Sequence, residues 1–176
     1  MKMIIASVLI VIGLTALSES ELESKESVNL VAPSVNAKQE FCLAQNIFFE
    51  AGNQSLEGMA AVADVTLNRV QNSRYPNDIC SVVKQGIKLH NGSMKRDSCQ
   101  FSWYCDGKSD KVPSISNKNW KTSLIVANAI LTNNKYRGIT DESTHYHATY
   151  VVPNWINDAG MIRTKQIGSH IFYKFW

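Results

Sequence analysis

The hydrophobic pattern in the first half of the chain has the period of α-helices. Between residues 39 and 51, apolar side chains recur every three or four positions, which places them on one face of a helix. They are Phe41, Ala44, Ile47 and Phe48. Gly52 follows at a position typical of a helix C-terminus. The pattern therefore predicts a helix whose last turn carries Glu50, directly behind an apolar run.

Similar patterns predict three further helices. Ser55 is a favourable N-cap for a second helix, whose apolar stripe continues until Asn72. Asn77 or Asp78 can cap a short third helix, and a fourth is expected between residues 120 and 133.

The last part of the chain changes character. Residues 144–152 alternate and are rich in Thr, Tyr and Val, and residues 167–176 resume this pattern after Pro153. Both segments are expected to be strands, whereas residues 86–98 are predicted to form an exposed loop. Helices followed by strands indicate an α+β domain, with a small antiparallel sheet beside a helical core.

The first residues have the layout of a secretory signal peptide. A lysine precedes an apolar run, and Ala16 and Ser18 are small residues at positions suited to cleavage. The run falls short of the ~20 residues that a membrane-spanning helix needs. We expect a signal peptide at 1–18, a flexible polar linker at 19–38 and the folded domain at 39–176. The expected location is periplasmic, cell-wall associated or extracellular, with membrane contact only through the signal segment.

Export changes how the four cysteines are interpreted. An even number of cysteines in an oxidising compartment favours disulfides over metal ligands. Three pairings are open. We favour Cys42 with Cys80, which lie in neighbouring helical stretches, and Cys99 with Cys105, which bracket a short segment. The formal net charge of +3 is too small to indicate a chemistry or a nucleic-acid partner. We find no internal repeat and expect a monomer.

Glu50 is the sharpest candidate for catalysis. A carboxyl desolvated by the apolar residues 47–49 has its ionised form disfavoured, so its pKa rises and it can hold a proton near neutral pH. A general acid in glycoside cleavage needs this property. The alternative is a solvated residue at the end of a helix.

Four blocks of sequence, taken in order, resemble the SleB-type cell-wall hydrolases, the family of spore cortex-lytic enzymes. The blocks are LAQNIFFEAGNQSLEGMAAVADVTLNRVQNSRYPNDICSVV, CQFSWYCDG, HYHATYVVPNW and IGSHIFY. Together they extend over roughly residues 40–173. The resemblance implies a lysozyme-like fold and a substrate of peptidoglycan glycan strands, cut between N-acetylmuramic acid and N-acetylglucosamine. It also implies that Glu50 is the acid, that no cofactor is needed, and that the products are those of a lytic transglycosylase.

A single acid agrees with that mechanism. Hydrolases that retain or invert configuration need a second carboxylate ~5–9.5 Å from the first, whereas a transglycosylase can use one Glu as acid and then as base. Glu57, Asp64 and Asp106 are the candidates for a second acid. We expect the first two to be solvated charges on a helix face.

The remaining candidates would bind the substrate. If residues 100–103 form a strand, alternation directs Gln100 and Ser102 to one face, which we assign to sugar contacts. Trp103, on the other face, could stack on a sugar ring or belong to the core. Residues 86–98 form a longer loop than is usual in the family. Their basic side chains, Lys88, Lys95 and Arg96, could rim the cleft.

The histidines allow a different chemistry. His145, His147 and His170 could hold zinc with an open position, which would make the protein a zinc amidase or peptidase. No HExxH or HxxEH motif accompanies them, and the resemblance implies no metal. We therefore assign Tyr146, His147, Trp155 and His170 to the cleft, with His147 as the first candidate for substrate contact. Histidines held by hydrogen bonds within the sheet, and a wall-binding module without catalysis, remain the alternatives.

Overall fold

The structure is a computed structural model that describes residues 35–176. The expected signal peptide, and the linker as far as residue 34, lie outside the described residues. No helix of the described part is both long and apolar enough to cross a membrane.

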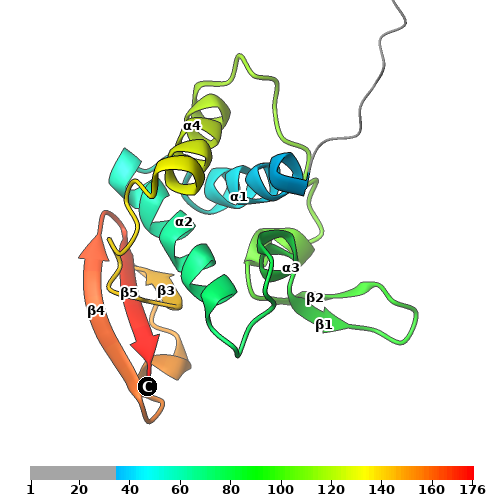
Figure 1. Ribbon diagram of the computed structural model, residues 1–176. Helices are drawn as coiled ribbons and strands as arrows, with labels where there is room; N and C mark the ends of the chain where they lie inside the picture. The colour runs from blue at the N-terminus through cyan, green and yellow to red at the C-terminus, as the bar shows by residue number, and fades with distance from the viewer. Residues whose placement is uncertain (1–34) are drawn as a thin grey trace, which may run out of the picture. The chain divides into compact units, whose positions relative to one another are not determined.

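Three long helices form the core of the domain. They are α1 (Val35–Ala51), α2 (Leu56–Gln71) and α4 (Lys118–Asn133), and they pack against one another in every pairing. Figure 1 shows α4 lying across α1 and α2. Their shared interior contains fully buried Leu43, Ile47, Val62 and Ile130. The predicted helical period therefore corresponds to the observed core, although α1 begins one turn before the predicted residue 39.

The helix starts follow the predicted capping chemistry. The Ser55 hydroxyl accepts a 3.3 Å hydrogen bond from the Gly58 amide at the start of α2. Asp78 accepts a 2.9 Å bond from the Ser81 amide at the start of α3 (Ile79–Val83). Both caps are confirmed.

A three-stranded antiparallel sheet packs beside this core, in the order β3 (His145–Ala148), β5 (His170–Phe175), β4 (Met161–Ile167). Phe172 of β5 is completely buried against Ala61 and Val65 of α2, which fixes one face of the sheet on that helix. The α+β class is confirmed. β3 ends four residues before the predicted strand does, and β4 was not predicted from the sequence.

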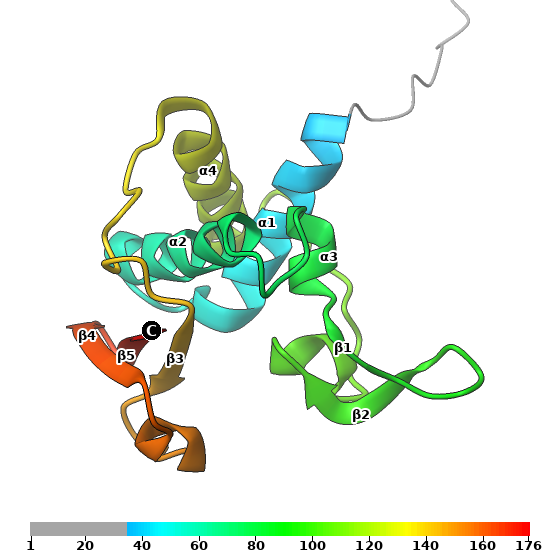
Figure 2. The same ribbon diagram turned by 60° about the horizontal axis from the view of Figure 1, so that its bottom comes forward.

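Residues 86–98 form a hairpin rather than the predicted loop. β1 (Gly86–Lys88) pairs antiparallel with β2 (Met94–Cys99), and Gly92 closes the turn with a φ of +82°. Most of the hairpin is exposed, so it lacks the alternation that marks a half-buried strand. Figures 1 and 2 show this hairpin and the three-stranded sheet on opposite sides of α1 and α2.

Candidate active site

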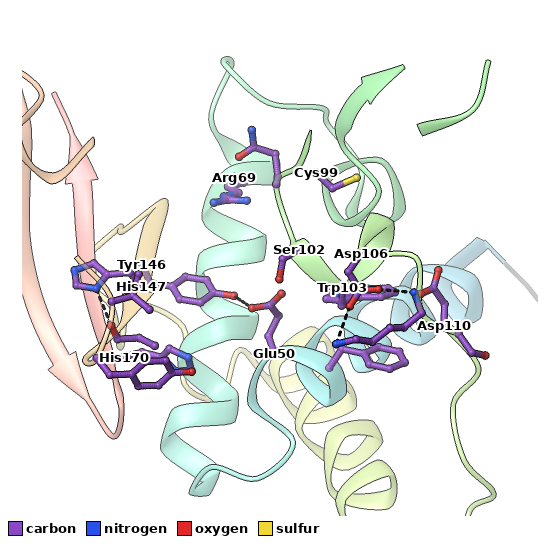
Figure 3. A pocket seen from close by; sticks show the side chains of 17 residues that line it. Glu50, Arg69, Cys99, Ser102, Trp103, Asp106, Asp110, Tyr146, His147 and His170 are labelled. Atoms are coloured by element: carbon purple, nitrogen blue, oxygen red, sulfur yellow. Dashed lines mark hydrogen bonds and ion pairs between the residues drawn. The ribbon is translucent and has the colours of Figure 1, made fainter. Parts of the chain in front are cut away.

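A pocket of about 600 Å³ lies beside the C-terminal turn of α1. Its walls come from α1, α2, the 3₁₀-helix η1 (Ser102–Cys105) with the segment after it, and the facing parts of β3 and β5. In Figure 3, Glu50 lies in the middle, with Tyr146 on the sheet side and Ser102 on the η1 side. The volume falls within the range of ~300–1,000 Å³ that is usual for small-ligand sites.

Glu50 has the environment that a proton donor needs. Burial raises the pKa of its carboxyl above the ordinary value, while the Tyr146 hydrogen bond and the Arg69 charge oppose that rise more weakly. The Tyr146 hydroxyl donates to Oε2 at 2.9 Å, as the dashed line in Figure 3 shows. Among the described residues the Glu50 carboxyl accepts this hydrogen bond through Oε2, which leaves Oε1 as the oxygen free to carry a proton into the pocket.

The sheet brings Tyr146 to this position. Its ring packs against those of His170, at 5.1 Å, and Phe172, at 5.6 Å, and Phe172 is in turn buried against α2. Burial and the neighbouring Glu50 raise the pKa of Tyr146 well above the ordinary value, so its hydroxyl keeps its proton and remains a donor.

Arg69 is a pocket residue that sequence reasoning missed. It is 4% exposed on α2, and its Nε donates a 2.7 Å hydrogen bond to the Thr144 carbonyl, directly before β3. Its guanidinium also lies 4.8 Å from the centre of the Phe101 ring. The available signal was its helical spacing, seven residues after Val62 and three after Thr66, which places it on the buried face of the second helix. A cation buried on such a face needs an interaction partner that compensates its charge, or a functional role.

Residues 100–103 do not form the predicted strand, because the chain turns into η1 at Ser102. Gln100, Ser102 and Trp103 all line the pocket nevertheless. The indole of Trp103 is stacked on Phe49 at 4.6 Å and donates a 2.9 Å hydrogen bond to Asn46. It is 6% exposed, so of the two roles left open for Trp103 the structure favours the core.

The three candidate second acids lie in different environments. Glu57 is exposed and does not line the pocket. Asp64 was expected to be a solvated charge, and this is wrong, because it is fully buried and bonded to Arg137 and Thr140. Asp106 lines the pocket together with Asp110. In Figure 3 both lie on the η1 side, away from Tyr146.

The histidines are divided between the two faces of the sheet. His170 pairs with Ala148, whereas His147 pairs with Ile171. Paired residues of antiparallel strands point to the same face and successive residues to opposite faces, so His145 and His147 point away from the face that carries His170. Within residues 35–176 no group of three His, Cys, Asp or Glu side chains could hold a metal ion.

His147 borders the pocket, but its ring is engaged elsewhere. Nδ1 lies 2.9 Å from the Ala148 carbonyl, which can only accept, so this nitrogen donates. Nε2 lies 3.0 Å from the Tyr173 hydroxyl. Trp155 packs on the same side, 5.7 Å from His147 and 5.3 Å from Tyr173, and is not among the residues that line the pocket. His170 does line it and is 7% exposed.

Both predicted disulfides are present, between Cys42 and Cys80 and between Cys99 and Cys105. The second joins the end of β2 to the end of η1 and so brackets Ser102. Lys88, Lys95 and Arg96 do not line the pocket, although Lys108 does.

Comparison with known proteins gives consistent results. The family model described as Cell Wall Hydrolase matches residues 53–173. The structure is similar to the catalytic domain of the germination-specific lytic transglycosylase SleB from Bacillus anthracis, with a TM-score of 0.55 and 24% identity over 81% of this chain and 98% of that one. It is also similar to the catalytic domain of the Bacillus cereus SleB protein, with a TM-score of 0.53 and 23% identity. That match covers 82% of this chain and 100% of the other. No curated protein sequence matches the chain.

Proposed function

The chain belongs to the cell-wall hydrolase family, and from this we propose that it cleaves peptidoglycan glycan strands between N-acetylmuramic acid and N-acetylglucosamine. The observation that carries the proposal is Glu50, a carboxyl with a raised pKa at the centre of a pocket, with one oxygen bonded to Tyr146 and the other free. The family match begins at residue 53, so the assignment of Glu50 rests on this geometry and on the motif around it.

In the proposed reaction Glu50 acts first as an acid. Its Oε1 donates a proton to the glycosidic oxygen, the bond from that oxygen to the muramic acid anomeric carbon breaks, and the N-acetylglucosamine part leaves. The resulting Glu50 carboxylate is stabilised by the Tyr146 hydroxyl and by the buried Arg69 cation. Both groups are held in place before the reaction, which avoids reorganisation as charge develops.

Glu50 then acts as a base. The 6-hydroxyl of the same muramic acid attacks the anomeric carbon, its proton returns to Glu50, and a 1,6-anhydro end is formed without consumption of water. This second step needs no further carboxylate. In support, Glu57 and Asp64 do not line the pocket, and Asp106 lies on the η1 side with its Oδ1 accepting from the Lys108 amide at 2.8 Å.

The site of action that we propose is outside the cytoplasm. The substrate is located there, and the two disulfides persist in an oxidising compartment. Residues 100 and 102, together with His170, are proposed to contact the sugars, because their side chains line the pocket around Glu50. The proposal involves no metal or cofactor.

Mass spectrometry of the products from purified peptidoglycan tests the reaction. Anhydro-muropeptides, released equally with and without a chelator, are the expected products. Ordinary reducing ends would indicate that water is the acceptor and would direct attention to Asp106 as a second acid. Release of stem peptides that a chelator abolishes would contradict the proposal and favour a zinc amidase.

A further inference from the structure

Tyr150 is an exposed aromatic residue on the wall of the pocket. It lines the pocket, and its side chain is 84% exposed. The next residue, Val151, also lines the pocket and is 44% exposed. Single exposed apolar residues are common on protein surfaces and need no explanation. An exposed aromatic on the wall of a pocket is different, because a ligand can cover it.

The backbone that carries Tyr150 is anchored on both sides. The Thr149 amide donates a 2.8 Å hydrogen bond to the Ser169 carbonyl, next to the start of β5. The Val151 amide donates a 2.9 Å bond to the Ala148 carbonyl at the end of β3. The ring therefore extends from a turn fixed to two strands, so little backbone entropy remains to be lost when it binds a ligand.

The same pocket carries polar side chains elsewhere on its wall. Lys108, Ser109 and Asp110 line it as well and supply polar groups from the segment after η1. A pyranose ring has faces of C–H groups and a rim of hydroxyl and acetamido groups. An aromatic face together with hydrogen-bonding side chains matches both parts of such a ring.

Tyr150 is separate from the reacting groups. It is four residues after Tyr146, so its Cα lies no more than about 14 Å from that of Tyr146. Among the described residues it has neither a hydrogen bond nor a ring contact with Glu50 or Tyr146. A sugar stacked on Tyr150 would therefore lie near the bond that Glu50 cleaves but contact a side chain outside the reacting groups.

We propose that Tyr150 is the stacking platform of an additional subsite, which binds a sugar ring of the glycan strand next to the cleavage point. This inference rests on the proposed function, and it makes Tyr150 a determinant of strand-length preference rather than a catalytic residue. Val152 provides a matched control, because it is 77% exposed in the same segment but does not line the pocket.

The test is calorimetric titration of Glu50→Gln protein with glycan oligosaccharides of increasing length, built from alternating N-acetylglucosamine and N-acetylmuramic acid. We expect Tyr150→Ala to weaken binding of the longer oligosaccharides by about five- to tenfold and to leave the shortest unaffected. Tyr150→Trp should preserve the affinity, and Val152→Ala should match the parent at every length. With Glu50 restored, Tyr150→Ala should raise KM on long strands with little change in kcat.

Two results would overturn the subsite. In the first, Tyr150→Ala binds the long oligosaccharides as tightly as the parent does. In the second, Val152→Ala weakens binding as much as Tyr150→Ala, which would indicate a general surface effect. If protein with Glu50 intact still releases glycan fragments, either result removes the subsite alone. If protein with Glu50 intact releases no glycan fragments and Glu50→Gln binds no oligosaccharide, the proposed function fails as well.

Discussion

The hydroxyl of Tyr146 donates a 2.9 Å hydrogen bond to Oε2 of Glu50, a residue 96 positions earlier in the chain. This contact joins the helical core to the sheet at the centre of the pocket. It also makes Glu50 an acid whose pKa depends on two elements at once, because burial at the end of α1 raises that pKa and the donor on β3 lowers it.

Tyr146→Phe should slow the reaction and move its pH dependence. Hydrogen bonds to charged groups contribute ~1.5–3 kcal/mol, so loss of this donor to the Glu50 carboxylate should lower kcat by about 10- to 100-fold. The pKa of Glu50 should rise, because the bond that lowers it is gone. Since the acid must be protonated, the alkaline limb of the pH profile of kcat should shift to higher pH. Tyr104→Phe, outside the pocket, is the control, and an unmoved alkaline limb would contradict this role.

Glu50→Gln should stabilise the protein in a pH-dependent way. The folded state raises the pKa of Glu50 above its ordinary 4.5, so folding disfavours the ionised form. Below pH 4.5 both states hold the proton and the two proteins should have equal Tm. As the pH rises through the folded pKa, the native protein should lose stability relative to Glu50→Gln, by about 2–8 °C in Tm for each 1 kcal/mol. Differential scanning calorimetry from pH 4 to 8 measures the difference in Tm between the two proteins. A difference that is constant with pH or of the opposite sign would contradict a raised pKa for Glu50.

Asp64→Asn should lower the stability of the folded protein without a direct effect on the catalytic step. The buried Asp64 carboxylate accepts hydrogen bonds from the Gly138 amide at 3.0 Å and from the Thr140 amide and hydroxyl at 3.1 and 2.7 Å, and it pairs with Arg137. Breaking a buried ion pair by removing one partner costs about 3–5 kcal/mol.

The exposed Glu57 supplies the control for that experiment. Glu57→Gln should change the free energy of unfolding by no more than about 0.5 kcal/mol. Denaturant unfolding gives both values, and kcat is measured where each variant is folded. If Asp64→Asn kept the free energy of unfolding of the native protein, the prediction that this ion pair stabilises the fold would be wrong.

The two disulfides should contribute differently to stability and to activity. Cys42–Cys80 closes 38 residues and Cys99–Cys105 closes 6, so loop entropy assigns them about 4 and about 2 kcal/mol. Replacing the first pair by Ser should lower Tm more, whereas replacing the second should lower kcat/KM more, because it frees η1 with Ser102 from the hairpin. The opposite order in kcat/KM would mean that the hairpin does not position the pocket.

The helices could be predicted because each carries several signals at once. α2 has a capping Ser55, an apolar stripe with helical period and a polar end at Asn72, and all three agree. The hairpin of residues 86–98 and strand β4 carry few buried residues, so the hydrophobic alternation that identifies strands is weak there. The Asn91-Gly92 pair is the signal that could have identified the hairpin turn.

Two of the predictions were physically incompatible, and the sequence could have shown it. Six extended residues reach about 20 Å, whereas a disulfide needs Cα atoms within about 7 Å. Cys99 and Cys105 are 6.0 Å apart, so the chain between them must fold back, as η1 does. A strand through Gln100 and Trp103 could not coexist with that bond.

The site itself was only partly predictable. Glu50 could be singled out from its apolar neighbours and from family resemblance, and Tyr146 was assigned to the cleft. Their hydrogen bond depends on how β3 packs against α2, a long-range arrangement that no local pattern encodes. The division of the histidines between two faces likewise follows from the pairing of β3 with β5.

The most direct test of the account compares the rate at which native protein and Glu50→Gln release soluble glycan fragments from purified peptidoglycan, at a pH where calorimetry shows both to be folded. Removal of a general acid costs about 10²- to 10⁴-fold in rate, so Glu50→Gln should show a loss of that size with an unchanged or higher Tm. Release by Glu50→Gln within a few-fold of the native rate would contradict it.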